Sequence, residues 1–301
     1  MKIPAGSRLS RAQLLASMLA LGLARAAPAF AQRRASADSV RIVTSDISRF
    51  WKVLDGGIGL DLDARLRDEY LAPGSAGLRA FAPREIGSAL DLARVIFSHQ
   101  SDYFSSRTTT LNARAAEPEI RSMMRRLQAL YPEAVLLDVY VVIGRHSVGG
   151  WTRGDTLVVA AEMYPSPAAL PVIVAHELVH RQQPAATGDQ TLLERSFHEG
   201  SADFVGALIS GATINVPAQQ YGRAHEHELW REFQGVMNGH EYLPWLYGGV
   251  VANRPADLGY FFGYRIAQSY YDRADDKATA VREILRVTDI TSFLTKSGYA
   301  P

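Results

Sequence analysis

Apolar residues recur at helical spacing between Ile42 and Tyr131. Three stripes in this region repeat every three or four residues, the pattern of helices with one apolar face. Pro73 follows the first stripe and Pro132 follows the last, as expected near helix ends. We therefore predict a largely helical region whose stripes face a core rather than a cofactor. The stripes consist of Phe50, Trp51, Leu54, Leu62, Leu66 and Tyr70; of Ile86, Leu90, Ala93 and Phe97; and of Ile120, Met123, Met124, Leu127 and Leu130.

The pattern changes at Val135. Residues 135–143 are apolar and rich in β-branched side chains, and residues 156–161 repeat that character, so both segments are predicted strands. The glycine-rich residues 144–154 between them are predicted to form a loop. A small sheet in a mostly helical chain makes α+β the expected fold class.

Two helices are predicted after the strands. The first begins at Pro171, which needs no amide donor in a first turn, and runs to Gln183. The second runs from about Thr191 to Ser210 and is capped by Gly211. The rest of the chain is expected to contain a loop at 215–219, a polar helix at 223–237 and closing helices at about 256–273 and 276–287.

The N-terminus has the three parts of a secretory signal peptide. A basic start precedes an apolar run at residues 14–24, and Ala29-Phe30-Ala31 fits the small-x-small cleavage rule. We predict cleavage after Ala31, export across the inner membrane and a periplasmic location. A membrane anchor is the alternative, but the run is about half of the ~20 apolar residues that span a bilayer. Residues 32–41 are predicted to form a flexible mature N-terminus.

Composition limits the chemistry. The chain has 301 residues and no cysteine, which excludes disulfides, a cysteine-linked lipid anchor and thiolate metal ligands. Of 32 basic and 31 acidic residues, the predicted signal peptide contains four basic and no acidic ones, so the mature chain has 28 against 31 and a net charge of −3. That balance gives no reason to expect nucleic-acid binding, and no later stretch is apolar enough for stable membrane insertion.

The sequence His176-Glu177-Leu178-Val179-His180 places two histidines four residues apart on a predicted helix. Residues at this spacing share one helix face, so both imidazoles can reach one Zn²⁺ at ~2.0–2.1 Å. Glu177 can then take a proton from a water at the open metal position. The other positions of this helix are apolar, and charge buried in such a helix requires a partner, which a metal ion supplies.

Glu199 and Asp203 extend the motif. Glu199 follows His180 by nineteen residues on the second predicted helix, which a short turn can bring alongside the first. Asp203 lies one turn further and can accept a hydrogen bond from the outer nitrogen of a ligating histidine. Gly200 and Ala202 permit close helix packing. Two histidines, one glutamate and a water make the open geometry of a catalytic zinc site, with one ion expected.

The motif HExxH followed by ExxxD on the next helix resembles the gluzincin metallopeptidases. The segments 176–183, 192–205 and 259–267 are similar to a bacterial family of predicted zinc-dependent proteases related to gliding-motility lipoprotein B. The resemblance implies a zincin-like core, a zinc site made by His176, His180 and Glu199, and Glu177 as general base. It also implies that strand 157–161 forms the edge of a substrate cleft, which Trp151 would shape. The missing anchor cysteine means that a gliding role does not carry over.

Residues 42–301 are expected to form one domain, with a helical part at 42–132 and a zinc-binding part at 133–301. The remaining site candidates come from the segment that contains Tyr260 and Tyr264. Either hydroxyl could stabilise the oxyanion, with Tyr264 preferred, and ordinary core packing is the alternative. Further polar residues are expected outside the metal shell: His198, with a bracing role on His180 left open; His225, His227 and His240, as solvated side chains; and Arg265, in a surface salt bridge rather than on a substrate carboxylate.

The sequence thus predicts a zinc metallopeptidase that acts on peptides or proteins. An esterase or other amide hydrolase with the same site stays open. The alternative from a different class is a non-catalytic, metal-bearing periplasmic binding protein or an envelope-associated protein with a vestigial motif.

Overall fold

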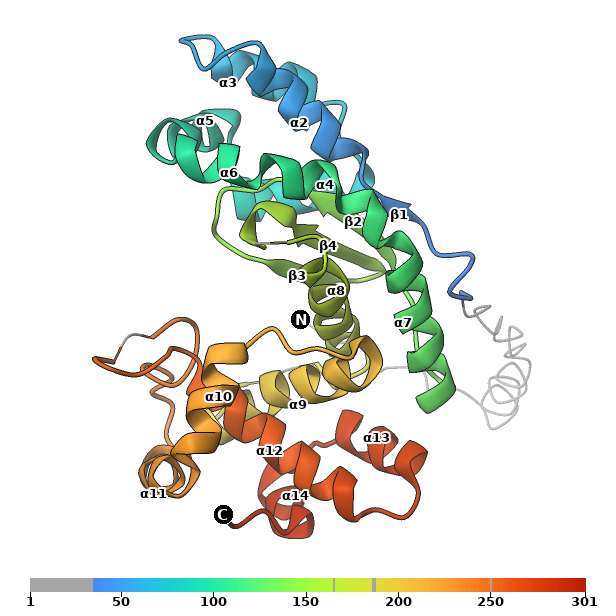
Figure 1. Ribbon diagram of the computed structural model, residues 1–301, viewed down its shortest axis with the longest axis vertical. Helices are drawn as coiled ribbons and strands as arrows, with labels where there is room; N and C mark the ends of the chain where they lie inside the picture. Colours follow the sequence, from blue (N-terminus) through green and yellow to red (C-terminus); the bar gives the residue numbers. More distant parts are fainter. Residues whose placement is uncertain (1–34, 165, 186–187, 250) are drawn as a thin grey trace, which may run out of the picture. The chain divides into compact units, whose positions relative to one another are not determined.

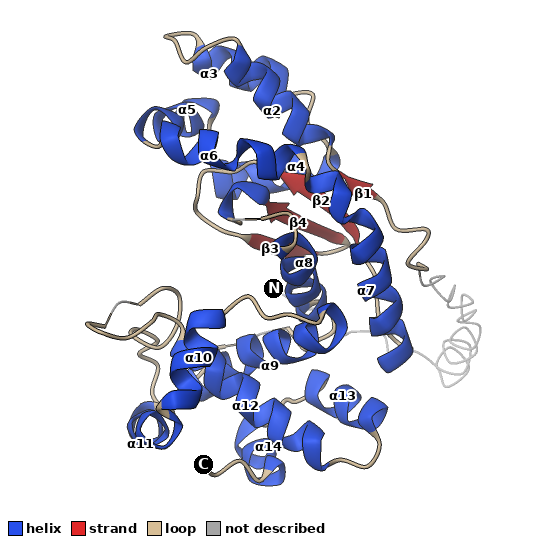
Figure 2. Cartoon of the chain, viewed as in Figure 1, coloured by secondary structure: helices blue, strands red, loops and turns tan. Residues whose placement is uncertain are grey.

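The structure is a computed structural model that describes residues 35–164, 166–185, 188–249 and 251–301, all within the unit Arg34–Pro301. Helices dominate and one small sheet lies among them (Figure 2), which confirms the predicted α+β class. The predicted signal peptide lies outside the described residues. Within them, no helix combines the length and the apolar character that a membrane crossing requires.

Four short strands form one mixed sheet in the order β1-β2-β4-β3. β1 and β4 pair in parallel with β2, and β3 pairs antiparallel with β4, with Gly150 opposite Val159. All but the first residue of β2 and of β4 are buried, as expected for apolar strands covered on both faces. The strands are β1 Ile42–Val43, β2 Asp138–Val142, β3 Gly150–Arg153 and β4 Thr156–Ala160.

The region before β2 is helical apart from β1. Its first and third apolar stripes face the core as predicted: Trp51 is 1% exposed, and Leu66 and Met123 are 0% exposed. Its elements are α2 Ser45–Asp55, α3 Leu62–Arg65, the π-helical η1 Leu66–Leu71, α4 Ala76–Phe81, the π-helical η2 Ala82–Ile86, α5 Ala89–Ser98, α6 Gln100–Leu111, the 3-10 turn η3 Ala113–Ala116 and α7 Glu117–Leu130.

The second predicted stripe is correct for two of its four residues. Ile86 and Ala93 are buried, at 0% and 3% exposed, but Leu90 and Phe97 are 46% and 48% exposed, whereas Leu92 is fully buried. The cause is Gly87, whose φ of +80° ends η2 before α5 begins. Because the chain leaves the helix between Ile86 and Leu90, Ile86 does not set the phase of α5.

The start of the described chain also differs from expectation. Two residues of the described segment 35–41 are buried, since Ala37 and Val40 are 2% and 3% exposed, whereas Ser36, Asp38 and Ser39 are exposed. β1 then takes the place of the expected helix. The amide of Val139 donates to the carbonyl of Arg41 at 2.9 Å and fixes this short strand beside β2.

The glycine-rich segment 144–154 is not all loop, because residues 150–153 form β3. This strand takes the edge of the sheet, and β4 lies between β2 and β3. The expectation that residues 157–161 form the cleft edge is therefore wrong. Four residues that begin with glycine have too little pattern to show a strand, and pairing with β4 decides their conformation.

The two motif-bearing helices form as predicted, and Figure 1 shows α4 and the first of them on opposite sides of the sheet. This helix, α8 Ala169–His180, follows β4 through the short turn η4 Ala161–Met163 and ends three residues before the predicted Gln183. The second, α9 Leu192–Ser210, begins with a capping box between Thr191 and Glu194 and ends at Gly211 in the left-handed conformation.

The C-terminal part contains five helices in the described residues: α10 Val216–Ala224, α11 Glu226–Val236, α12 Leu258–Arg273, α13 Lys277–Leu285 and α14 Ile290–Ser297. The predicted loop at 215–219 is wrong, because α10 begins at Val216 with Pro217 in its first turn, where a missing amide is tolerated. A third closing helix, α14, follows the two expected ones and is capped by Asp289.

Glycines bring α9 and α12 into backbone contact. A Cβ at Gly200 would overlap the backbone of Tyr260 and Tyr264, and one at Gly263 would overlap the carbonyl of Ser196. Gly200 therefore permits the close packing that its small size predicts, against α12. On the other side of α9, a Cβ at Gly206 would come 3.4 Å from the backbone nitrogen of His176, so α8 also lies close.

Candidate metal centre

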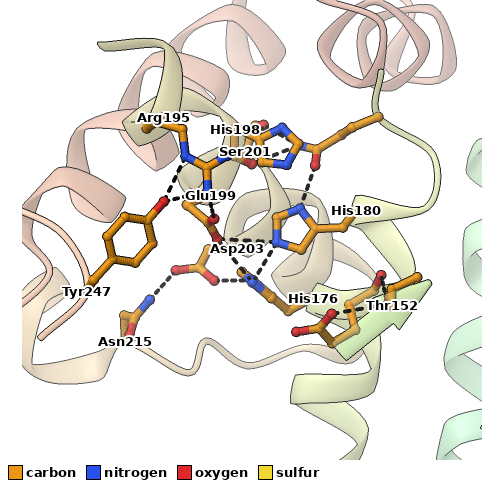
Figure 3. Close-up of polar contacts among 12 residues, drawn as sticks. Thr152, His176, His180, Arg195, His198, Glu199, Ser201, Asp203, Asn215 and Tyr247 are labelled. Carbon is orange, nitrogen blue, oxygen red and sulfur yellow. Dashed lines mark hydrogen bonds and ion pairs between the residues drawn. The ribbon is translucent and has the colours of Figure 1, made fainter. Parts of the chain in front are cut away.

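Three side chains from α8 and α9 converge on one point (Figure 3). Nε2 of His176 and Nε2 of His180 lie 2.9 Å apart, and Oε2 of Glu199 lies 3.5 Å from the first and 3.2 Å from the second. His176 and Glu199 are 6% and 8% exposed, so the point is shielded from water. The structure thus brings together the three residues whose spacing in the sequence predicts metal ligands.

The helices meet in opposite senses. The Gln183 side-chain amide, just after α8, donates to the carbonyl of His198 at 2.8 Å, whereas His176 contacts Asp203. Later residues of the first segment therefore meet earlier residues of the second. This arrangement, which the short connection between the helices allows, places Glu199 opposite both histidines.

The outer nitrogens of both histidines are held by hydrogen-bond acceptors. Nδ1 of His176 lies 2.7 Å from Oδ1 of Asp203, and Nδ1 of His180 lies 2.7 Å from Oε1 of Gln183. The Gln183 orientation follows from its amide nitrogen, which donates to the His198 carbonyl. Each Nδ1 therefore carries the hydrogen, and each Nε2 presents a lone pair to the point where Glu199 Oε2 also points.

Three lone pairs facing one another require a cation. Burial lowers the pKa of His176, but hydrogen bonds to Asp203 and Glu199 outweigh it and raise the pKa well above its ordinary value. Burial alone would raise the pKa of Glu199, yet the imidazoles of His180 and His176 hold it well below its usual range. A proton and a metal ion therefore compete for the same position.

The separations fit a tetrahedral zinc ion. Two ligand atoms at ~2.0–2.1 Å from such an ion are about 3.3 Å apart. The observed separations of 2.9, 3.2 and 3.5 Å scatter around that value. All three donors are nitrogen or oxygen, which zinc accepts, and three protein ligands leave one position open.

Glu177 lies beside the centre but faces the sheet. Its Oε2 accepts a hydrogen bond of 3.1 Å from the hydroxyl of Thr152 on β3. A Cβ at Gly150 would overlap the Glu177 carboxylate, so glycine at this position leaves the space that the side chain occupies. The edge strand thus determines where the Glu177 carboxylate lies.

Arg195 and Tyr247 lie on the other side of the centre from Thr152 (Figure 3). Nη2 of Arg195 is 3.5 Å from Oε1 of Glu199, the oxygen that does not face the histidines. Nε of Arg195 donates to the Tyr247 hydroxyl at 2.7 Å, and Nη1 donates to Gln190. One oxygen of Glu199 is therefore directed to the arginine and the other to the imidazoles.

The expected accessory residues take different places. The ring of His198 stacks on that of His180 at 4.7 Å, and burial lowers the pKa of His198 to about 3. Burial, together with the charges of Glu199 and Asp257, raises the pKa of Tyr260, whose backbone packs against Gly200 beside Glu199. Tyr264 instead packs edge-on against Phe204 at 5.2 Å.

The remaining sequence candidates lie outside the centre. Arg265 forms a salt bridge with Glu226 at 2.7 Å, as predicted, but both side chains are partly buried and not at the surface. His225, His227 and His240 are exposed, as expected for solvated side chains.

Sequence reasoning missed several residues of the site. Two of them could have been predicted from their spacing. Gln183 follows His180 by three residues and Arg195 precedes Glu199 by four, and residues at these spacings are neighbours on a helix. Thr152, Gly150 and Tyr247 had no such signal, because they reach the centre from β3 and from the segment between α11 and α12. Asn215, which donates to Oδ2 of Asp203 at 2.6 Å, follows the end of α9 and also had no local signal.

The class that this fold and site define is an α+β protein with a candidate metal centre of two histidines and one glutamate. The chain belongs to the family described as predicted Zn-dependent protease (DUF2268), which matches residues 139–289. That range contains β3, β4, all of β2 except Asp138, and all three candidate ligands. Searches of curated proteins and of solved structures found no match.

Proposed function

We propose that this protein is a zinc-dependent metallopeptidase in which His176, His180 and Glu199 hold one Zn²⁺. The observation that carries the proposal is the convergence of three lone pairs, with both outer nitrogens already used as donors. When bound, zinc supplies Lewis-acid activation of a water and of the substrate carbonyl. The family description supports the same class of chemistry.

Glu177 is the general base of this proposal. It takes a proton from the attacking water and returns it to the leaving amine. The hydrogen bond from Thr152 and the space left by Gly150 hold the carboxylate against the edge strand. The edge strand therefore orients the base.

A tyrosine hydroxyl completes the proposed chemistry by donating to the developing oxyanion. We assign this role to Tyr260, because its backbone packs against Gly200, the residue that follows Glu199, and because burial, together with the charge of Glu199, raises its pKa. Tyr264, the preferred residue from the sequence, contacts Phe204 and is the second candidate. Replacing each by phenylalanine distinguishes them: the larger fall in kcat at unchanged zinc content identifies the donor.

The edge strand is also the proposed binding site for an extended peptide or protein substrate. An edge strand offers unpaired backbone groups to a substrate that adds as a further strand. β3 occupies the edge next to Glu177, and Trp151 on it packs edge-on with Phe81 at 6.4 Å. Backbone pairing would thus deliver a peptide bond to the metal centre.

The substitution Glu177→Gln tests the proposal most sharply. It should keep one zinc per chain and abolish peptide cleavage, whereas His180→Ala should lose the metal. Full activity in Glu177→Gln would overturn the assignment of the base. A non-catalytic binding protein would keep zinc and cleave no member of a broad peptide library, and a vestigial site would hold no zinc.

The proposal includes export to the periplasm by the signal peptide at residues 1–31. The mass of the protein recovered from the periplasm tests it, since a chain that begins at Gln32 is expected. The relationship to gliding-motility lipoprotein B rests on the quoted motifs, and no gliding role is proposed.

A further inference from the structure

Tyr247, in the segment between α11 and α12, has an unusual backbone conformation. Its φ is +59°, in the left-handed region that favours glycine. Asp257, the residue before α12, also has a positive φ, and its Oδ1 accepts from the amide of Gly248 at 2.8 Å. Such conformations persist where the surrounding structure enforces them, and they cluster at binding and catalytic sites.

The hydroxyl of Tyr247 lies at a charged group beside the metal centre. Nε and Nη2 of Arg195 both donate to it, and Nη2 also lies 3.5 Å from Oε1 of Glu199. A single guanidinium nitrogen therefore contacts both the phenol and a candidate ligand. Figure 3 shows the hydroxyl directed at Arg195 and Glu199. Tyr247 is 48% exposed, so a substrate at the centre can reach it.

The hydrogen of this hydroxyl is unused. A guanidinium has N–H donors and no acceptor, so Arg195 cannot receive it. None of the residues that the structure describes accepts it either. Burial raises the pKa of Tyr247, although the hydrogen bond from Arg195 opposes it, so the phenol keeps its hydrogen at neutral pH. Two N–H groups on the phenol oxygen also polarise the O–H bond and make it a stronger donor.

The side of the metal centre on which Tyr247 lies indicates what it can bind. Thr152 holds the proposed base Glu177, and Arg195 and Tyr247 lie on the other side of the centre (Figure 3). The base must lie beside the attacking water, so groups that receive the developing charge on the substrate carbonyl belong on the opposite side. An unused O–H and the positive charge of Arg195 suit an oxygen that becomes negative.

We propose that Tyr247 is a second hydrogen-bond donor to the carbonyl oxygen of the scissile peptide bond, and that Arg195 positions and polarises it. The inference rests on the proposed peptidase function and adds two residues to it. A tetrahedral oxyanion has room for more than one hydrogen bond, so Tyr247 acts together with Tyr260. The hydrogen stays on the phenol, and the hydrogen bond strengthens as negative charge develops on the oxygen.

The substitution Tyr247→Phe tests this role. Because loss of one oxyanion donor lowers kcat about 100-fold or more, kcat should fall by that factor, while KM should change less than about threefold. Zinc content should not change. Tyr242→Phe is the matched control, since Tyr242 lies in the same segment and packs edge-on against Tyr247 at 6.0 Å. Its hydroxyl already donates to the carbonyl of Gln190 at 2.6 Å, so this variant should keep the kcat of the wild type.

A binding measurement keeps this test separate from the proposed function. A phosphinic peptide, whose tetrahedral anion imitates the oxyanion, should bind zinc-loaded Tyr247→Phe about 100-fold more weakly than the wild type or Tyr242→Phe. Weaker binding in a protein that cleaves no peptide would support the donor and overturn the peptidase. Equal affinity for the phosphinic peptide, or peptide cleavage with an unchanged kcat in Tyr247→Phe, would overturn the donor.

The substitution Arg195→Lys tests the positioning role. Lysine keeps a positive charge beside Glu199 but lacks the planar fork that donates twice to the phenol. Alone, it should lower kcat about 10-fold, and combined with Tyr247→Phe it should add less than about twofold to the loss from that variant. The same loss in both backgrounds would mean that the arginine does not act through the phenol, and would overturn its assigned role.

Discussion

Two buried glutamates, Glu199 and Glu162, have almost the same exposure and opposite chemistry. They are 8% and 6% exposed. Facing imidazoles hold the pKa of Glu199 well below its usual range, although burial opposes them. Burial raises the pKa of Glu162 to about 7, because only backbone amides such as those of Gly144 and His146 face it.

The surroundings of Glu162 explain the difference. Its Oε1 accepts from the amide of His146 at 3.3 Å, and its Oε2 has no hydrogen-bond partner among the described residues. Glu199 instead points one oxygen at two imidazoles and the other at Arg195. Burial alone makes a carboxylate prefer its proton, and converging partners make it a metal ligand.

The largest expected effect is the loss of zinc affinity when Glu199 is replaced by glutamine, and the same replacement at Glu162 is its control. Glu199→Gln removes one of three ligands and should weaken zinc binding more than 100-fold, beyond the ~10–100-fold lost with an outer hydrogen-bond partner. Glu162→Gln, equally buried, should bind zinc as the wild type does. Competition with a chromophoric chelator measures both affinities. Equal losses in the two variants would show that general destabilisation, and not ligation, is being measured.

The next largest effect is a dependence of the protein's stability on pH, which Glu162 causes. Its folded pKa of about 7 lies above the reference value of 4.5, so its contribution to stability is full below pH 4.5 and is lost as pH rises through 7. The loss amounts to about 3 kcal/mol for this difference in pKa.

The neutral Glu162→Gln should not show that loss. Urea denaturation of both proteins at pH 5 and pH 8 gives the comparison, and the variant should gain stability relative to the wild type at the higher pH. If the two proteins differed in stability by the same amount at both pH values, the pKa of Glu162 would not be raised by burial.

A smaller loss of zinc affinity is expected when Asp203, the partner of His176 outside the metal shell, is changed. Asp203→Asn keeps the shape of the side chain but removes the charge that faces Nδ1 of His176 at 2.7 Å. Zinc affinity should fall ~10–100-fold, the range typical of outer partners of metal ligands. His225→Asn is a control at an exposed position and should leave the chelator titration unchanged.

The smallest expected effect on zinc affinity tests whether Arg195 orients Glu199 as strongly as the imidazoles do. Tyr247→Phe removes the hydroxyl that receives a hydrogen bond of 2.7 Å from Arg195 but leaves the arginine beside Glu199. Zinc affinity should change by at most about fivefold, equivalent to one hydrogen bond of ~1 kcal/mol. A change as large as that in Asp203→Asn would mean that the arginine, and not the imidazoles, orients Glu199.

The contrast between Glu199 and Glu162 also explains which site residues could be predicted from the sequence. His176, His180, Glu199 and Asp203 lie on two helices, so their spacing places them on known faces. Glu162 had no comparable signal, because its neighbours come from the segment after β2 and its pKa depends on burial.

Fold predictions failed for the same reason. β3 and β1 are short, and partner strands determine their conformation, so their own residues do not reveal them. The phase of α5 depends on Gly87, whose positive φ is a property of the folded chain. Long stripes such as that of α7 were predicted correctly because local periodicity alone determines them.

The zinc content of the purified wild-type protein tests the central claim most directly. Elemental analysis after dialysis into metal-free buffer should give one zinc per chain, because three lone pairs converge at a shielded point. A properly folded chain that contains no zinc, and takes up none when the ion is supplied at neutral pH, would contradict the account.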